Sequence, residues 1–186
     1  YQEGILSAKY RDVLLSCRAN YYNVLVTHNR DTTKVAILFD TWIEMIKRQA
    51  IDPIIFELFH RRYAEPFDYY TFGVEFARSL VDLSRSHIVR EHLIVRMVDQ
   101  LSRGENVVLF GNHQTEADPQ ILSVLLEPKY HHFVADIIFV AGERVLVDLL
   151  AAPFSLGRNL LCIYSKKHIE NPPKYKSKKQ MHNKRT

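Results

Sequence analysis

The sequence has no long uninterrupted apolar run and only two cysteines, which sets aside several classes of protein at once. Charged residues or histidine interrupt every apolar stretch before the roughly 18 residues that a membrane-spanning helix needs, so we expect a soluble protein. Cys17 and Cys162 form neither a CxxC pair nor a zinc-spaced cluster. This pattern indicates two reduced thiols and no disulfide framework. The charged first residues also lack a secretory signal pattern.

The motifs of several large enzyme classes are missing as well. There is no P-loop, no GxGxxG and no GxSxG, so nothing supports nucleotide cleavage, dinucleotide chemistry or serine-hydrolase chemistry. With 186 residues, of which 47% are hydrophobic, the chain is long enough to bury a core without disulfides or a structural metal. We therefore expect a globular protein with no metal and no cofactor.

Positive charge is concentrated at one end of the chain. The residues from Lys166 to Thr186 include eight Lys or Arg and one acid, a local charge of +7, whereas the preceding residues carry 17 basic and 20 acidic side chains, a charge of −3. A basic tail is typical of segments that bind phosphate, nucleic acid or an anionic surface, but it is also typical of a solvated chain end. A nucleic-acid partner is not expected, because the basic residues do not alternate with exposed aromatic residues.

Apolar residues at three- and four-residue steps predict a small helical bundle over residues 1–60. The expected helices cover residues 5–25, the stretch from Asp31 to the break at Asp52-Pro53, and a short segment over residues 53–60. Asp31 is the expected N-cap of the second helix.

The following part, residues 61–186, changes in character and is predicted to be an α/β domain with a mixed, partly parallel sheet. Helices are expected over residues 64–83 and 88–101, and strands over residues 106–110, 137–140 and 160–164. Tyr69, Tyr70 and Phe72 are expected in the core, and the segment after residue 169 is expected to be loose.

The first candidate for chemistry is the segment Gly111-Asn112-His113-Gln114-Thr115-Glu116-Ala117-Asp118-Pro119. It places an imidazole at the end of an expected strand and a carboxylate five residues later. A histidine held by a carboxylate through one ring nitrogen presents the other as a general base. The alternative is that His113 is a surface residue and Asp118 a helix cap.

The pair His131 and Asp136 has the same spacing but precedes a strand. Ligands bind at the carboxyl ends of strands in α/β sheets, so position favours His113 and Asp118.

A second candidate is Ser165-Lys166-Lys167-His168, which follows the last expected strand and so should open on the same sheet edge as His113. Lysine and histidine there would suit a substrate phosphate. The alternative is that these residues begin a solvated tail. Arg144 and Arg158 are interpreted as structural ion-pair partners.

Four segments together resemble the soluble plastid glycerol-3-phosphate acyltransferases: EPFDYYTFG, NHQTEADP, FVAGERVL and PFSLGRNLLCIYSKKH. The resemblance is dense from about residue 64 to residue 168 and weak before that. It implies a helical domain packed on an α/β acyltransferase domain, located in the plastid stroma. It also implies transfer of a fatty acyl group from acyl-acyl carrier protein or acyl-CoA to the sn-1 hydroxyl of glycerol 3-phosphate, giving lysophosphatidic acid, with possible transient contact with a membrane surface.

The resemblance also implies roles for individual residues. His113 corresponds to the general base and Asp118 to its orienting carboxylate, while Lys167 and His168 correspond to residues that bind the substrate phosphate. A glycine- and arginine-rich segment that completes the phosphate site in the family is absent, because no glycine follows Gly157 and only Arg185 follows Arg158. The α/β domain therefore looks truncated at its C-terminal side.

Two other hypotheses remain open at this point. The chain could be a catalytically incomplete fragment that binds acyl carrier protein or an anionic surface through its basic end. It could also keep the chemistry and use lysophosphatidic acid as the acceptor, although the lack of a membrane span argues against this.

Overall fold

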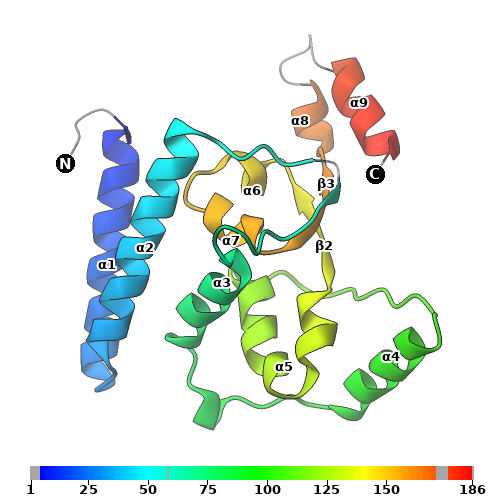
Figure 1. Cartoon of the computed structure of the whole chain (residues 1–186), viewed down its shortest axis with the longest axis horizontal. Helices are drawn as coiled ribbons and strands as arrows, with labels where there is room; N and C mark the ends of the chain where they lie inside the picture. Colours follow the sequence, from blue (N-terminus) through cyan, green and yellow to red (C-terminus); the bar gives the residue numbers. More distant parts are fainter. Residues whose placement is uncertain (1–4, 58, 171–175, 186) are drawn as a thin grey trace.

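The computed structural model describes residues 5–57, 59–170 and 176–185, with the backbone alone described for residues 167 and 168. Figure 1 shows two long helices on one side, a small sheet with short helices in the middle, and two helices near the C-terminal end. In chain order the elements are α1 (Ala8–Thr27), α2 (Thr32–Ile51), β1 (Phe59–His60), α3 (Tyr69–Arg78), the 3-10 helix η1 (Leu83–Arg85), α4 (His92–Ser102), α5 (Asp118–Ala135), β2 (Ile138–Gly142), α6 (Arg144–Val147), α7 (Ala152–Leu156), β3 (Asn159–Ile163), α8 (Lys166–Glu170) and α9 (Lys176–Arg185).

The first two expected helices are confirmed as α1 and α2. Ser7 caps α1 by accepting a hydrogen bond from the N–H of Tyr10, and Asp31 caps α2 by accepting one from the N–H of Thr33. Such caps satisfy N–H groups that have no partner inside the helix. The apolar stripe of α2 faces the core and includes the buried Phe39, Trp42 and Ile46. α1 buries fewer residues, Leu14, Tyr21 and Leu25, and its Val13 and Val24 are exposed.

The expected helix over residues 53–60 is wrong. Residues 53–57 have no regular structure, and residues 59 and 60 form the short strand β1. The side-chain amide of Gln49 holds Ile54 in place, accepting from its N–H at 3.1 Å and donating to its carbonyl at 3.0 Å. Asp52, which precedes Pro53, leaves the helical region, as the residue before a proline commonly does.

The helix expected over residues 64–83 is confirmed in its middle part as α3. Asp68 caps α3 by accepting from the N–H of Thr71 at 3.0 Å. Tyr69, Tyr70 and Phe72 are buried, as expected. After α3, Asp82 organises the turn of η1 in the same way, by accepting from the N–H of Ser84.

Aromatic side chains form the centre of the main core. Tyr21, Phe39, Trp42, Phe76 and Phe154 meet in edge-on and tilted pairs whose ring centroids lie 5.0 to 5.7 Å apart. Such pairs add about 0.5–1.5 kcal/mol each beyond the area they bury. They come from α1, α2, α3 and α7, so one apolar cluster joins both sides of residue 60. The division into domains at that residue stays a prediction.

The sheet is mixed, as predicted. Its strand order is β1-β3-β2, with β1 antiparallel and β2 parallel to β3. Two of the three expected strands, over residues 137–140 and 160–164, are confirmed as β2 and β3. Together with the surrounding helices, this arrangement confirms the α/β class.

The third expected strand, over residues 106–110, is wrong. These residues have no regular structure, and Phe110 is 96% exposed. A strand forms only when its backbone groups find a partner, and no strand pairing is found for this run among the described residues. His113 therefore does not stand at the end of a strand.

The expectation of a loose tail is also wrong for residues 176–185, which form α9. Asn183 pairs with the backbone of Tyr164, accepting from its N–H and donating to its carbonyl, both at 2.7 Å. His182 Nε2 lies 2.6 Å from the carbonyl oxygen of Cys162. Lys179 is buried beside the Tyr164 ring, 5.1 Å from its centroid. These contacts hold α9 against β3 and Tyr164. The low hydrophobicity of the segment predicted a loose tail because it gives no sign of these polar contacts.

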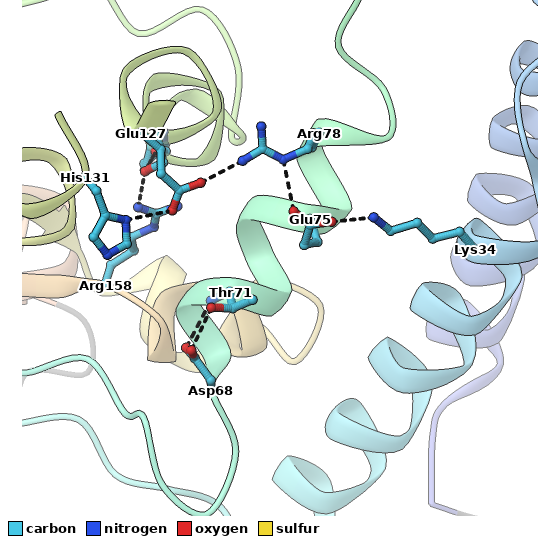
Figure 2. Close-up of polar contacts among 10 residues, drawn as sticks. Lys34, Asp68, Thr71, Glu75, Arg78, Glu127, His131 and Arg158 are labelled. Atoms are coloured by element: carbon cyan, nitrogen blue, oxygen red, sulfur yellow. Dashed lines mark hydrogen bonds and ion pairs between the residues drawn. The ribbon is translucent and has the colours of Figure 1, made fainter. Parts of the chain in front are cut away.

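A chain of charged side chains connects the helices that surround the sheet. Figure 2 shows Lys34 of α2 bonded to Glu75 of α3, and Arg78 of α3 bonded to both Glu75 and Glu127 of α5. The network is half-buried and ties α5 to the helical side of the molecule. None of the described helices is long and apolar enough to cross a membrane.

Candidate active site

The polar turn before α5 brings His113 and Asp118 together. Asp118 is the first residue of α5, and Pro119 follows where the helix tolerates proline, because the first helical N–H groups need no intrahelical partner. One carboxylate oxygen of Asp118 accepts from Nδ1 of His113 and from the N–H of Gln114, both at 2.8 Å. The other oxygen accepts from the N–H of Thr115 at 3.2 Å. One carboxylate thus closes the whole turn.

Thr115 has a part in this turn that sequence reasoning missed. Its hydroxyl accepts from the N–H of Ala117 at 3.3 Å, while Asp118 reaches back to the N–H of Thr115. These two bonds close a tight turn immediately before α5, in which Thr115 uses both its hydroxyl and its N–H. Thr and Asp at this spacing favour such turns, and that was a signal in the sequence that could have found it. The Asp118 carboxylate accepts from groups that precede α5, and no side chain caps the helix at its N-cap residue Ala117. The alternative that Asp118 is a helix cap is therefore wrong, and its carboxylate is the partner of His113.

The electrostatics of the turn set the state of both side chains. The N–H of Gln114 and, next, the imidazole of His113 lower the pKa of Asp118 below its ordinary value. An ionised carboxylate only accepts hydrogen bonds, so Nδ1 of His113 carries the proton and donates it. Nε2 has no hydrogen-bond partner among the described residues, and the His113 side chain is 68% exposed. Nε2 is then a basic nitrogen that a substrate hydroxyl can reach.

The competing pair of the same spacing does not form. Nδ1 of His131 lies 3.2 Å from Glu127, and Asp136 ends α5. Figure 2 shows that Glu127 also accepts from Arg78, at 2.6 Å. His131 thus belongs to the network that joins α3 and α5, and its partner is not the carboxylate that its spacing suggested.

Lys167 and His168 lie in α8, directly after β3, but their side chains are outside the described part of the structure. Figure 1 shows α8 beyond the upper end of β3, whereas α5 lies in the lower half of the molecule. The expectation that both groups open on one sheet edge is therefore wrong for this structure. The physical reason is the unpaired run over residues 106–110, which does not carry His113 to the edge where β3 ends.

The expected ion pairs of Arg144 and Arg158 are not found among the described residues. Arg158 is buried and donates to the hydroxyl of Ser123 instead. No group of three or more His, Cys, Asp or Glu that could hold a metal occurs within residues 5–57, 59–170 and 176–185. The expectation of no metal and no cofactor stays a prediction.

Comparisons with known proteins identify the family of the chain. The sequence profile of the acyltransferase family matches residues 92–186, just over half of the chain. The chain is 40% identical over 157 residues to the chloroplastic glycerol-3-phosphate acyltransferase of Phaseolus vulgaris, an alignment that covers 83% of this chain. It is 39% identical over 168 residues to the protein of the same name from Pisum sativum and 36% identical over 177 residues to that from Arabidopsis thaliana, which cover 89% and 95% of the chain.

The chain spans only about a third of the length of these relatives, from 34% to 37%. The segment that contains His113 and Asp118 lies inside the region matched by the family profile.

Proposed function

We propose that this chain, which belongs to the acyltransferase family, is part of a plastid enzyme that acylates the sn-1 hydroxyl of glycerol 3-phosphate. The donor is acyl-acyl carrier protein or acyl-CoA, the product is lysophosphatidic acid, and the location is the plastid stroma. The observation that carries the proposal is the geometry of His113 and Asp118, which leaves one basic ring nitrogen exposed. The names of the relatives supply the substrate and the organelle.

In the proposed reaction, Nε2 of His113 removes the proton of the sn-1 hydroxyl as that oxygen attacks the thioester carbonyl. Asp118 stabilises the imidazolium that forms and keeps the proton on Nδ1. When the tetrahedral intermediate collapses, the carbon–sulfur bond breaks, and the imidazolium returns its proton to the departing thiolate. An ester and a free thiol result, and His113 is again neutral.

The phosphate of the substrate is assigned to Lys167 and His168 in α8. Both residue types bind phosphate, lysine as a point charge and histidine as a hydrogen-bond donor. Because glycerol 3-phosphate is small, a productive complex requires the turn at His113 and the start of α8 to approach each other. Replacing Lys167 by Ala should therefore raise KM for glycerol 3-phosphate more than it lowers kcat.

The experiment that tests the function is an acyl-transfer assay with labelled glycerol 3-phosphate. It compares acyl-acyl carrier protein with acyl-CoA, in this chain and in a chain extended to the length of the relatives. Formation of labelled lysophosphatidic acid in either chain supports the proposal. Absence of product in both, with a relative from Pisum sativum active in the same assay, would contradict it.

One observation favours a second candidate function, a binding module for an acidic partner. α9 carries five basic residues and no acid, and four of the five are exposed. An acidic carrier protein would be attracted to such a helix, and the binding would weaken as salt is added. This candidate predicts salt-sensitive binding of carrier protein without turnover in the extended chain.

A further inference from the structure

Arg158 is an unusual residue because its guanidinium is buried without an ion pair. The residue is 4% exposed and lies between α7 and β3. Its Cζ atom lies 4.9 Å from the centroid of the Tyr70 ring, and Nη1 donates to Ser123 Oγ at 2.6 Å. A second nitrogen of the guanidinium, Nη2, is buried and has no hydrogen-bond partner. Burial lowers the pKa of Arg158 to about 10.

A buried cation of this kind is costly to the folded state, since its desolvation is compensated only in part. An apolar side chain of similar length would fill the same space at lower cost. What Arg158 supplies and an apolar residue does not is a charged donor to Ser123 at a fixed position. Hydrogen bonds from charged groups are roughly twice as strong as neutral ones and more strictly directed.

The Ser123 hydroxyl that accepts from Arg158 also bonds to the start of α5. The residue is completely buried, and its hydroxyl donates to the carbonyl oxygen of Pro119 at 3.1 Å. Pro119 follows Asp118 directly. A single hydroxyl therefore connects Arg158 to the first turn of the helix from which the Asp118 carboxylate projects.

The His113 side chain depends on that first turn. Its one hydrogen bond in the described structure is to Asp118, and most of its surface is exposed. Asp118 in turn is placed by the backbone of α5. A shift of the first turn would thus move the carboxylate, and the imidazole would follow or lose its partner.

A second arginine offers an internal comparison. Arg78 also joins α5 to α3, through Glu127 at 2.6 Å, and Figure 2 shows this contact beside Arg158. Glu127 lies nine residues after Asp118, more than two helical turns away. Arg78 and Arg158 both fasten α5, but only Arg158 does so at the end that carries Asp118.

We infer that Arg158 is a positioning residue for the His113–Asp118 pair and acts through Ser123 and the first turn of α5. A role of Arg158 in catalysis rests on the proposed function. Its effect on the geometry of the His113–Asp118 pair does not, and it can be measured without turnover.

The test is NMR of this chain with labelled histidine and aspartate. It follows the carboxyl carbon of Asp118 across pH and the two ring nitrogens of His113, in the unmodified protein and in Arg158→Met, Ser123→Ala and Arg78→Met. We expect Asp118 in Arg158→Met and Ser123→Ala to titrate closer to its ordinary range, with a weaker preference for the proton on Nδ1. Arg78→Met should lower thermal stability and leave both signals unchanged.

Ser123→Ala keeps the size of the side chain nearly constant. If Arg158→Met does not fold, this variant alone shows whether the contact between Arg158 and Ser123 positions the His113–Asp118 pair. Unchanged Asp118 and His113 signals in Ser123→Ala, or an equal change in Arg78→Met, would overturn the inference. In an active extended chain, Ser123→Ala should lower kcat about tenfold or more and change KM less than about twofold. Lack of His113-dependent turnover would sink the proposed function alone, because the NMR comparison still decides the role of Arg158.

Discussion

Asp118 Oδ2 lies 2.8 Å from His113 Nδ1 and accepts the N–H of Gln114 at the same distance. The carboxylate therefore shapes the turn and orients the imidazole with one oxygen. An amide in its place could present N–H to Nδ1 and select the wrong tautomer. We expect Asp118→Asn to lower kcat for acyl transfer about a hundredfold, less than the loss of His113 itself. Asp136→Asn is the matched control, since Asp136 has the same spacing from His131, and equal losses in both variants would contradict the assignment.

Acid should weaken the fold through carboxylates that are paired in the folded chain. The hydrogen bond from Lys34, and then that from Arg78, lowers the pKa of Glu75 below its ordinary value. Because the folded pKa is the lower one, this stabilisation is complete above the pKa of the unfolded chain and is lost as pH falls through the folded pKa. The free energy of unfolding in urea should therefore decrease below about pH 4.3. The decrease should be smaller in Glu75→Gln but not in Glu116→Gln, and identical acid profiles for all three proteins would contradict this.

Gly157 is required by a close approach of two backbone segments. A Cβ atom at this position would lie 2.5 Å from the carbonyl oxygen of Tyr69, in the first turn of α3. Backbone atoms cannot move aside as a flexible side chain can, so Gly157→Ala should reduce the free energy of unfolding by about 1–3 kcal/mol. Gly142→Ala is the control, because a Cβ there meets nothing within 4 Å. Similar urea midpoints for the two variants would contradict a close approach of the two backbone segments.

The attachment of α9 can be measured by amide hydrogen exchange. Asn183 accepts from the N–H of Tyr164 and donates to its carbonyl, so Asn183→Ala removes both bonds. We expect faster exchange at the Tyr164 N–H and through α9, with β2 and α3 unchanged. The exposed Gln180 on the same helix supplies the control variant, Gln180→Ala. If protection at Tyr164 persists in Asn183→Ala, another contact holds α9 in place.

Much of the helical part of the fold follows from the sequence. The apolar stripe of α2 and its cap at Asp31 depend on residues close in sequence, and local patterns capture them. The strands expected over residues 137–140 and 160–164 also form, as β2 and β3, because each is a short apolar run bounded by turn residues. The fold class and the partly parallel sheet were predictable from the alternation of these segments.

Two of the failures have a common cause, which is dependence on partners that are distant in the sequence. Residues 106–110 have the composition of a strand, yet pairing is decided by what lies beside them, and composition does not contain that information. The reverse holds for residues 176–185, which contain a single apolar residue. They are held by contacts of Asn183, His182 and Lys179 with β3 and Tyr164. Short-range patterns cannot anticipate either outcome.

The candidate site could be predicted only where its residues are close in the sequence. The pairing of His113 with Asp118 occurs within one turn, and spacing was sufficient to suggest it. The contact of Arg158 with Ser123 spans 35 positions and could not be found from spacing. The positioning role that we infer for Arg158 follows only from the way the residues before β3 pack against α5.

The central claim is that Nε2 of His113 is the general base, and a paired comparison of His113→Ala with His131→Ala tests it most directly. The measurement is the single-turnover rate of acyl transfer to glycerol 3-phosphate in the chain extended to the length of its relatives. We predict that His113→Ala lowers this rate about 10²- to 10⁴-fold, as the loss of a general base does, while His131→Ala leaves it within about threefold. A His113→Ala rate close to that of the unmodified enzyme would contradict the mechanism.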